Sequence, residues 1–152
     1  MAAKKRKPSP KTKTTNKPGK TRTQIESADP VFAGGVDVRR AMWGPDGADN
    51  QIDTAGDFIW PMQQVVTRYC FGETWTRKGL PRKVRSMITL GMLVAMGRPH
   101  ELKVHVRGAI ANGVTKLEIQ EVLLHAMVYA GIPRGVEGFR SAAETLKEMG
   151  LE

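Results

Sequence analysis

The sequence predicts an all-α protein, and three observations carry this prediction. Apolar residues recur at intervals of three and four along several stretches, which is the period of one helical face. Thr115 and Glu118 stand three residues apart before an apolar run, a spacing typical of a capping box at a helix start. No stretch shows the period-two alternation of a half-buried strand. At 152 residues, the chain is long enough for one domain with its own core.

The positive charge of the chain is concentrated in its first 24 residues. The formal net charge is +9; residues 1–24 hold nine Lys or Arg and no acid, whereas residues 25–152 hold fifteen basic and fifteen acidic side chains. The basic segment is too poor in apolar side chains to offset the entropy of ordering it. We expect a disordered basic tail at 1–24 and a helical domain at 25–152. The run KKRK is either a nuclear-import or polyanion-binding patch, or part of a solubilising or adventitious extension.

The first half of the domain is expected to contain two helices. A short helix over 36–42 is followed by an irregular loop rich in Gly, Asp and Asn. The second helix covers about 57–71, with Asp57 as N-cap and Pro61 tolerated in its first turn. Helical spacing gives it an apolar row made of Phe58, Met62, Val65, Val66 and Tyr69. The segment that follows is expected to be a loop carrying Trp75.

The second half of the domain is expected to contain four helices. The segment from 82 to about 97 is apolar on more than one face, so this helix should be nearly surrounded, partly by other subunits. A helix over 100–111 follows, with Pro99 in its first turn and a stop at Asn112 and Gly113. The capping box then opens a helix that ends near 131–133, and Glu118 is read as a structural cap. A last helix covers about 135–149.

Cys70 is the single cysteine. An intramolecular disulfide and a cysteine-pair redox centre are therefore excluded within one chain. The longest apolar run is far shorter than a membrane span, and the opening segment lacks the apolar region of a secretory signal. We expect a cytoplasmic protein.

The most polar stretch, GRPHELKVHVRGA at 97–109, carries candidates for chemistry. His100 and His105 are five apart and point about 140° away from each other on a helix, so they cannot share one metal ion. Glu101 and His105, four apart, share a face, and Arg98 joins them if the helix begins early enough. Such a row can bind a carboxylate and move a proton. It fits a solvated helix face equally well, and spacing alone leaves both alternatives open.

Several motifs in order resemble those of the carboxymuconolactone decarboxylase family, between about residues 58 and 148. They are WTRKGLPRKVRSMITLGML, RPHELKVHVRGA, NGVTKLEIQEVLLHA and VYAGIP. The resemblance implies an alkylhydroperoxidase-D-like helical bundle that assembles as a trimer or hexamer. The peroxidase branch carries Cys-x-x-Cys-x-x-x-His, and the matching positions here are Arg98, Glu101 and His105, with the relay glutamate position at Ser86. Thiol peroxidase chemistry is therefore not expected.

The decarboxylase branch removes CO2 from 4-carboxymuconolactone in the β-ketoadipate pathway of aromatic degradation, without metal or organic cofactor. By this resemblance, we expect a cofactor-free carboxy-lyase acting on that compound or a related carboxylated lactone. Arginines can hold the carboxylates, and a histidine oriented by a carboxylate can deliver a proton to carbon. The expected catalytic residues are His105 and its partner Glu101. The expected substrate-binding residues are Arg98, Arg85, His125, Tyr129 and Trp75.

Two departures from the family pattern concern the substrate. Arg134 stands where many relatives have a small residue, and the loop at 44–51 lacks a histidine that typical decarboxylases carry nearby. Another lactone or a keto acid is therefore an alternative substrate. An alternative of another class is a non-enzymatic oligomeric scaffold whose basic tails bind a polyanion such as nucleic acid.

Overall fold

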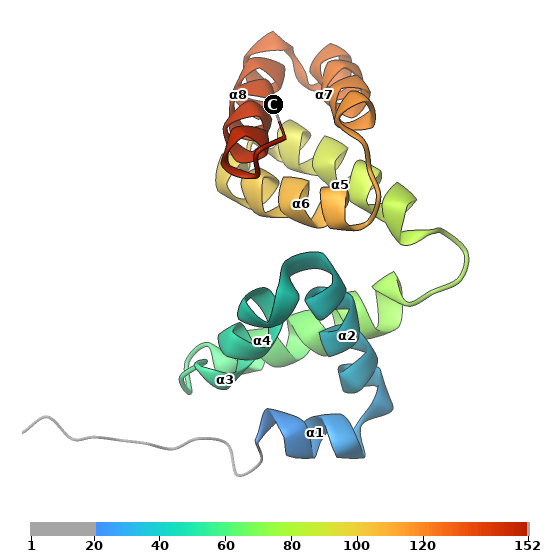
Figure 1. Cartoon of the computed structure of the whole chain (residues 1–152), viewed down its shortest axis with the longest axis vertical. Helices are drawn as coiled ribbons and strands as arrows, with labels where there is room; N and C mark the ends of the chain where they lie inside the picture. The colour runs from blue at the N-terminus through green and yellow to red at the C-terminus, as the bar shows by residue number, and fades with distance from the viewer. Residues whose placement is uncertain (1–20, 152) are drawn as a thin grey trace, which may run out of the picture.

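The computed structural model describes residues 21–151, which form helices in two groups (Figure 1). The first group comprises α1 (Arg22–Ala28), α2 (Pro30–Pro45), η1 (Asp46–Asn50), α3 (Gln51–Asp53), α4 (Trp60–Val65) and η2 (Val66–Trp75). The second comprises α5 (Arg82–Met96), α6 (Pro99–Ala111), α7 (Lys116–Ala130) and α8 (Ile132–Glu148). No strand occurs within the described residues, which confirms the all-α prediction. Residues 1–20, most of the predicted tail, lie outside the described part.

The second group is a four-helix bundle (Figure 1). Its buried residues form one apolar cluster that includes Leu90, Val94, Leu102, Val106, Ile119 and Leu123. The predicted capping box is present: the Thr115 Oγ1 accepts from the Glu118 backbone N–H at 3.2 Å, and the Glu118 carboxylate accepts from the Thr115 backbone N–H at 2.8 Å. The Lys83 ammonium, 2.7 Å from the Glu118 carboxylate, and these capping bonds lower the pKa of Glu118 to about 2. Glu118 is therefore a structural cap, as predicted.

The first group is more helical than the sequence predicted. Helix α1 begins at Arg22, with Thr21 as its N-cap, and thus includes the last residues of the segment expected to be a tail. The predicted loop at 44–51 is wrong: after a kink at Gly44, where φ is 69°, the chain continues as η1 and α3. The residues of this segment have a low helix propensity, and ion pairs stabilise its helical conformation instead. Arg40 Nε donates to both carboxylate oxygens of Asp49, at 3.0 and 2.9 Å, and Arg22 Nη1 lies 2.7 Å from Asp49 Oδ1.

The helical segment formed by α4 and η2 turns its polar side inward. The side chains of Gln63 and Thr67 are buried, and both accept hydrogen bonds from Nη1 of the buried Arg39, at 2.9 and 2.7 Å. Burial lowers the pKa of Arg39. The apolar row predicted on this helix is therefore largely exposed, with Phe58 at 94% and Tyr69 at 66%. A buried guanidinium is costly unless its N–H groups have hydrogen-bond acceptors. The face of α4 and η2 that carries Gln63 and Thr67 is therefore the buried one.

The boundaries of this segment also differ from the prediction. It begins at Trp60, three residues after the predicted cap Asp57, and it continues to Trp75, which is helical rather than in a loop. The reason is packing, because the Trp75 ring lies 5.6 Å from that of Phe71 and both are buried. None of the helices within residues 21–151 is both long and apolar enough to cross a bilayer.

Candidate functional site

His105 lies in the middle of α6, on the side of that helix that contacts α2. It is half-buried, and its ring meets the Trp43 ring edge-on, with the centroids 5.5 Å apart and the planes at 86°. Its Nδ1 is buried and has no hydrogen-bond partner. Burial lowers the pKa of His105, whereas the Glu101 carboxylate one turn earlier acts in the opposite direction. The imidazole is therefore held mainly neutral at pH 7.

Arg85, near the start of α5, is the second group with unused hydrogen-bonding capacity. Its Nη2 donates to the carbonyl oxygen of Arg77 at 3.1 Å, but its Nε is buried without a partner. Within residues 21–151, Arg85 Nε and His105 Nδ1 are the two buried side-chain nitrogen or oxygen atoms that lack a partner. Because buried polar groups are nearly always hydrogen-bonded, both atoms are candidates for contact with a ligand. The sequence placed both residues in the site independently of this observation.

Glu101 and Arg98 differ in their relation to His105. Helix α6 begins at Pro99, and Arg98 is its N-cap, with φ of −114° and ψ of 71°. The row therefore contains Glu101 and His105 alone, because the helix does not begin early enough to include Arg98. Glu101 is exposed and acts on His105 through its charge. Arg98 is exposed too, and in the described part of the chain it makes no ion pair.

The residue that departs from the family pattern, Arg134, belongs to the first turn of α8, and its side chain reaches the turn between α5 and α6. Gly97, with φ of 64°, ends α5 there, and a Cβ at this glycine would lie 1.6 Å from Nη1 of Arg134. The guanidinium of Arg134 therefore packs directly on the backbone next to Arg98. This contact requires a glycine for two reasons, the positive φ and the lack of space.

His125 and Tyr129 lie together on α7, away from His105. Their rings are 4.8 Å apart, and they line a groove of about 940 Å³ between α5 and α7. The other lining residues are mostly apolar: Val84, Met87, Ile88, Gly91, Met92, Ala95, Glu121, Val122, Ala126 and Ala130. His105 is not among them, so the single chain does not bring the predicted histidines into one pocket. Tyr129 is 80% exposed, which leaves this groove open.

Trp75 is a core residue rather than the cover of a pocket. It is 7% exposed and packs on Phe71, whose ring meets that of Trp43 edge-on at 5.5 Å. Cys70 is half-buried beside the same cluster, and burial raises the pKa of its thiol. The aromatic residue next to His105 is thus Trp43, which the sequence interpretation missed. No local signal could have found it, because it lies 61 residues away from its α6 contact, Val104.

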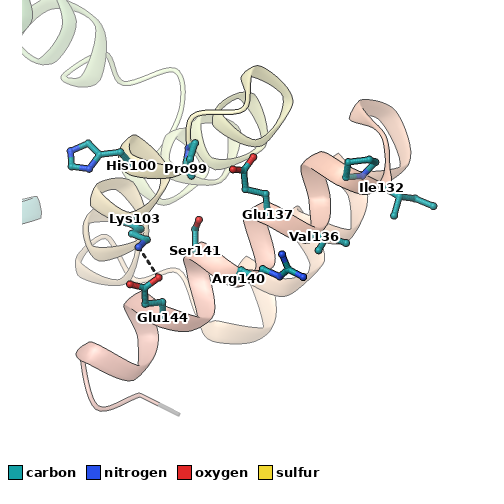
Figure 2. A pocket seen from close by; sticks show the side chains of 10 residues that line it. Pro99, His100, Lys103, Ile132, Val136, Glu137, Arg140, Ser141 and Glu144 are labelled. Carbon is teal, nitrogen blue, oxygen red and sulfur yellow. Dashed lines mark hydrogen bonds and ion pairs between the residues drawn. The ribbon is translucent and has the colours of Figure 1, made fainter.

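His100 lines a different surface, a groove of about 720 Å³ between the start of α6 and α8 (Figure 2). An ion pair between Lys103 Nζ and Glu144 Oε2, 2.7 Å long, crosses this groove, and Glu137 and Arg140 also line it. The two histidines of α6 therefore lie on different sides, as their spacing predicted. Among the residues that the structure describes, no group of three or more His, Cys, Asp or Glu side chains could hold a metal ion.

Comparison with known proteins gives related sequences over most of the domain. The family model described as "Carboxymuconolactone decarboxylase family" matches residues 61–144. A 4-carboxymuconolactone decarboxylase of Acinetobacter baylyi is 38% identical over 117 residues, which cover 77% of this chain and 87% of the relative. A nitrosuccinic acid decarboxylase of Metarhizium robertsii is 40% identical over 119 residues, which cover 78% of this chain and 83% of the relative. The family match includes α5, α6 and α7, and thus both unpartnered nitrogen atoms.

Proposed function

Because the chain belongs to the carboxymuconolactone decarboxylase family, we propose that it is a carboxy-lyase acting on 4-carboxymuconolactone or a related small carboxylate, without metal or organic cofactor. The two relatives are named for 4-carboxymuconolactone and for nitrosuccinic acid. Loss of CO2 from either compound leaves an electron pair that an oxygen-bearing group, a lactone carbonyl or a nitro group, can accept. The proposed substrates therefore share one feature. The carbon that carries the carboxylate is bonded to an electron-accepting group or is conjugated to one.

The observation that carries this proposal is the pair of buried, unpartnered nitrogens on Arg85 and His105. An arginine suits a carboxylate, because its planar group donates two parallel hydrogen bonds. A half-buried imidazole suits proton transfer to carbon. Arg98, exposed at the start of α6, is a proposed second anion binder. In the proposed reaction, the bond to the carboxylate carbon breaks and its electron pair moves into the acceptor.

The second half of the proposed reaction is protonation. CO2 leaves, and the resulting carbanion, delocalised as an enolate or nitronate, takes a proton at carbon from the cationic form of His105, which water then reprotonates. Burial lowers the pKa of His105 below its usual 6.5. Because kcat/KM reports the ionisation of the free enzyme, it should fall as the pH rises through this depressed pKa.

The test is a spectrophotometric assay with freshly generated 4-carboxymuconolactone, run beside related lactones and nitrosuccinate. We expect His105→Gln to lower kcat by about 10²- to 10⁴-fold. His100→Gln is the matched control, because His100 is on the same helix but lines the other groove, and it should keep wild-type turnover. Wild-type turnover by His105→Gln would refute the assignment of the proton donor. Absence of CO2 release from every compound in the panel would refute the proposed activity.

We further propose that the chain forms a homo-oligomer, a trimer or hexamer by the family resemblance, through the groove between α5 and α7. Four large apolar side chains at this groove or on its two helices are strongly exposed: Ile88 at 47%, Met92 at 51%, Val128 at 79% and Tyr129 at 80%. Apolar patches of this kind mark interaction sites. Met92→Glu places a charge in this groove and should reduce the mass measured by sedimentation equilibrium. Thr23→Glu adds the same charge at an exposed position outside the groove and should leave the mass unchanged. A monomeric wild-type chain would refute the proposal.

A further inference from the structure

Trp43, close to the end of α2, is attached to the backbone of α6. Its indole Nε1–H donates to the carbonyl oxygen of Val104 at 3.0 Å. Val104 immediately precedes His105, so the hydrogen bond fixes the indole beside the imidazole. The two rings then meet edge-on, with 5.5 Å between the centroids and 86° between the planes. This geometry is the one that aromatic rings prefer, and it restricts rotation of the imidazole about its side-chain bonds.

Two neighbours hold Trp43 in this place. Gly108, one turn after Val104, leaves room for the end of Met42 and for the indole: a Cβ at this glycine would lie 2.6 Å from Cε of Met42, and 3.0 Å from Nε1 and 3.2 Å from Cε2 of Trp43. Phe71 of η2 makes a second edge-on contact with Trp43, at 5.5 Å and 88°. The indole is therefore supported from α6 and from η2, while it belongs to α2. A side chain fixed by three elements is suited to orient another one.

We propose that Trp43 is a positioning residue, which holds the His105 imidazole in the orientation needed for proton transfer. This inference rests on the proposed function of His105. Trp43 does not transfer the proton itself, because indole has only a very weakly acidic N–H, which is used by the backbone of α6. Its role is to set where the imidazole points and to exclude water from one side of it.

Burial by these rings also affects the charge of His105. Burial lowers its pKa, and Glu101 of the same helix is the single charged group, among the described residues, that acts against this. The helices packed on α6, namely α2, α5 and α8, contribute no charged group to this balance. Removing the indole should therefore let water reach the imidazole and raise the pKa of His105 toward its usual value.

The experiment is an NMR titration of the three histidines in the full chain, with His105→Gln used to assign the signal. In wild type, His105 should titrate below 6.5, and in Trp43→Ala its titration should move up toward 6.5. Trp43→Phe keeps a ring and should restore the low value. Trp60→Ala is the matched control, because Trp60 belongs to a separate apolar cluster with Phe32, Val36 and Ile52, and it should leave the titration of His105 unchanged. The titration uses no substrate, so it gives a result even if the decarboxylase activity is absent.

Activity provides the second measurement. Trp43→Ala should lower kcat by about 10- to 100-fold with a smaller change in KM, because a misplaced group slows the chemical step more than binding. Gly108→Ala covers the case in which Trp43→Ala does not fold. The added methyl group meets the flexible end of Met42 at 2.6 Å and the indole at 3.0 Å, so it should press the indole away from α6 by a few tenths of an ångström while every aromatic ring is kept. It should therefore shift the titration of His105 in the same direction. An unshifted titration in a folded Trp43→Ala or in Gly108→Ala, or an equal shift in Trp60→Ala, would overturn the proposal.

Discussion

Gly35 is the position at which helix α2 comes closest to the backbone of η2. A Cβ built at Gly35 would lie 1.9 Å from the carbonyl oxygen of Thr67 and 2.9 Å from the backbone nitrogen of Gly72. Both obstacles are backbone atoms, so no side-chain rotation can relieve the clash. Moving the new carbon from 1.9 Å to even 3.0 Å from that oxygen requires the two helices to separate. The separation would also disturb the hydrogen bond from Arg39 to Thr67.

The magnitude follows from two opposing effects of Gly35→Ala. Replacing a helical glycine by alanine stabilises by about 1 kcal/mol. Overpacking typically costs about 1–3 kcal/mol, and more where backbone must move. Because the clash is with backbone, its cost should be about 2–4 kcal/mol, so the net effect of Gly35→Ala should be to lower the free energy of unfolding by about 1–3 kcal/mol. The neighbouring Gly34 is the control, because a Cβ there meets its nearest atom, Thr76 Cγ2, at an ordinary 3.7 Å.

Gly34→Ala gains the same helix propensity without the clash and should raise the free energy of unfolding by up to about 1 kcal/mol. The assay is urea denaturation followed by far-ultraviolet circular dichroism, at one protein concentration for all variants because an assembling chain has a concentration-dependent stability. The difference between the two variants isolates the close approach, because their propensity gains cancel. If Gly35→Ala is as stable as Gly34→Ala, the packing of α2 on η2 described above is refuted.

Three further predictions concern stability in other parts of the chain. Thr115→Ala removes an N-cap of α7 and should lower the free energy of unfolding by about 0.5–2 kcal/mol, measured by urea denaturation; no loss would contradict the capping box. The pKa of Glu118 is lowered to about 2, so its stabilisation is complete above the unfolded value of 4.5 and is lost as the pH falls toward 2. Glu118→Gln should therefore flatten the pH dependence of the unfolding midpoint in that window, and an unchanged slope would argue against the contact with Lys83. Arg39→Met leaves Gln63 and Thr67 without their donor and should cost about 1–3 kcal/mol, whereas a neutral result would show that these acceptors find other partners.

The second half of the fold could be predicted because its signals are local. The first turn of α6 is marked by Pro99, its end by Asn112 and Gly113, and the start of α7 by Thr115 and Glu118. Each of these residues acts on the backbone within one turn of itself, so a linear sequence contains the information. The helix bounds observed there lie within a few residues of those expected.

The first half could not be predicted to the same extent, because distant contacts decide it. Residues 46–53 are rich in Asp, Asn and Gly and favour a loop, yet the ion pairs of Asp49 with Arg22 and Arg40 support a helical path. The inward face of α4 and η2 depends in the same way on Arg39. A hydrophobic pattern alone assigns the apolar side to the interior, and it has no means of representing a buried cation.

The candidate site shows the same division between local and distant information. The shared face of Glu101 and His105 follows from their spacing of four. The contact of His105 with Trp43 joins helices from the two groups, and no spacing rule relates residues so far apart. The assignment of His125 and Tyr129 to the same pocket as His105 was an inference across helices, and within one chain the structure separates them.

The buried guanidinium of Arg39, on α2, has a consequence for the outer surface of α4 and η2. The hydrogen bonds from Arg39 to Gln63 and Thr67 prevent α4 and η2 from rolling about their axis. The apolar residues Met62, Val65 and Tyr69 of these helices, exposed at 48%, 61% and 66%, therefore cannot be turned inward by a local rearrangement. They face outward for as long as the domain is folded, so the single chain keeps an apolar strip available for contact with other molecules.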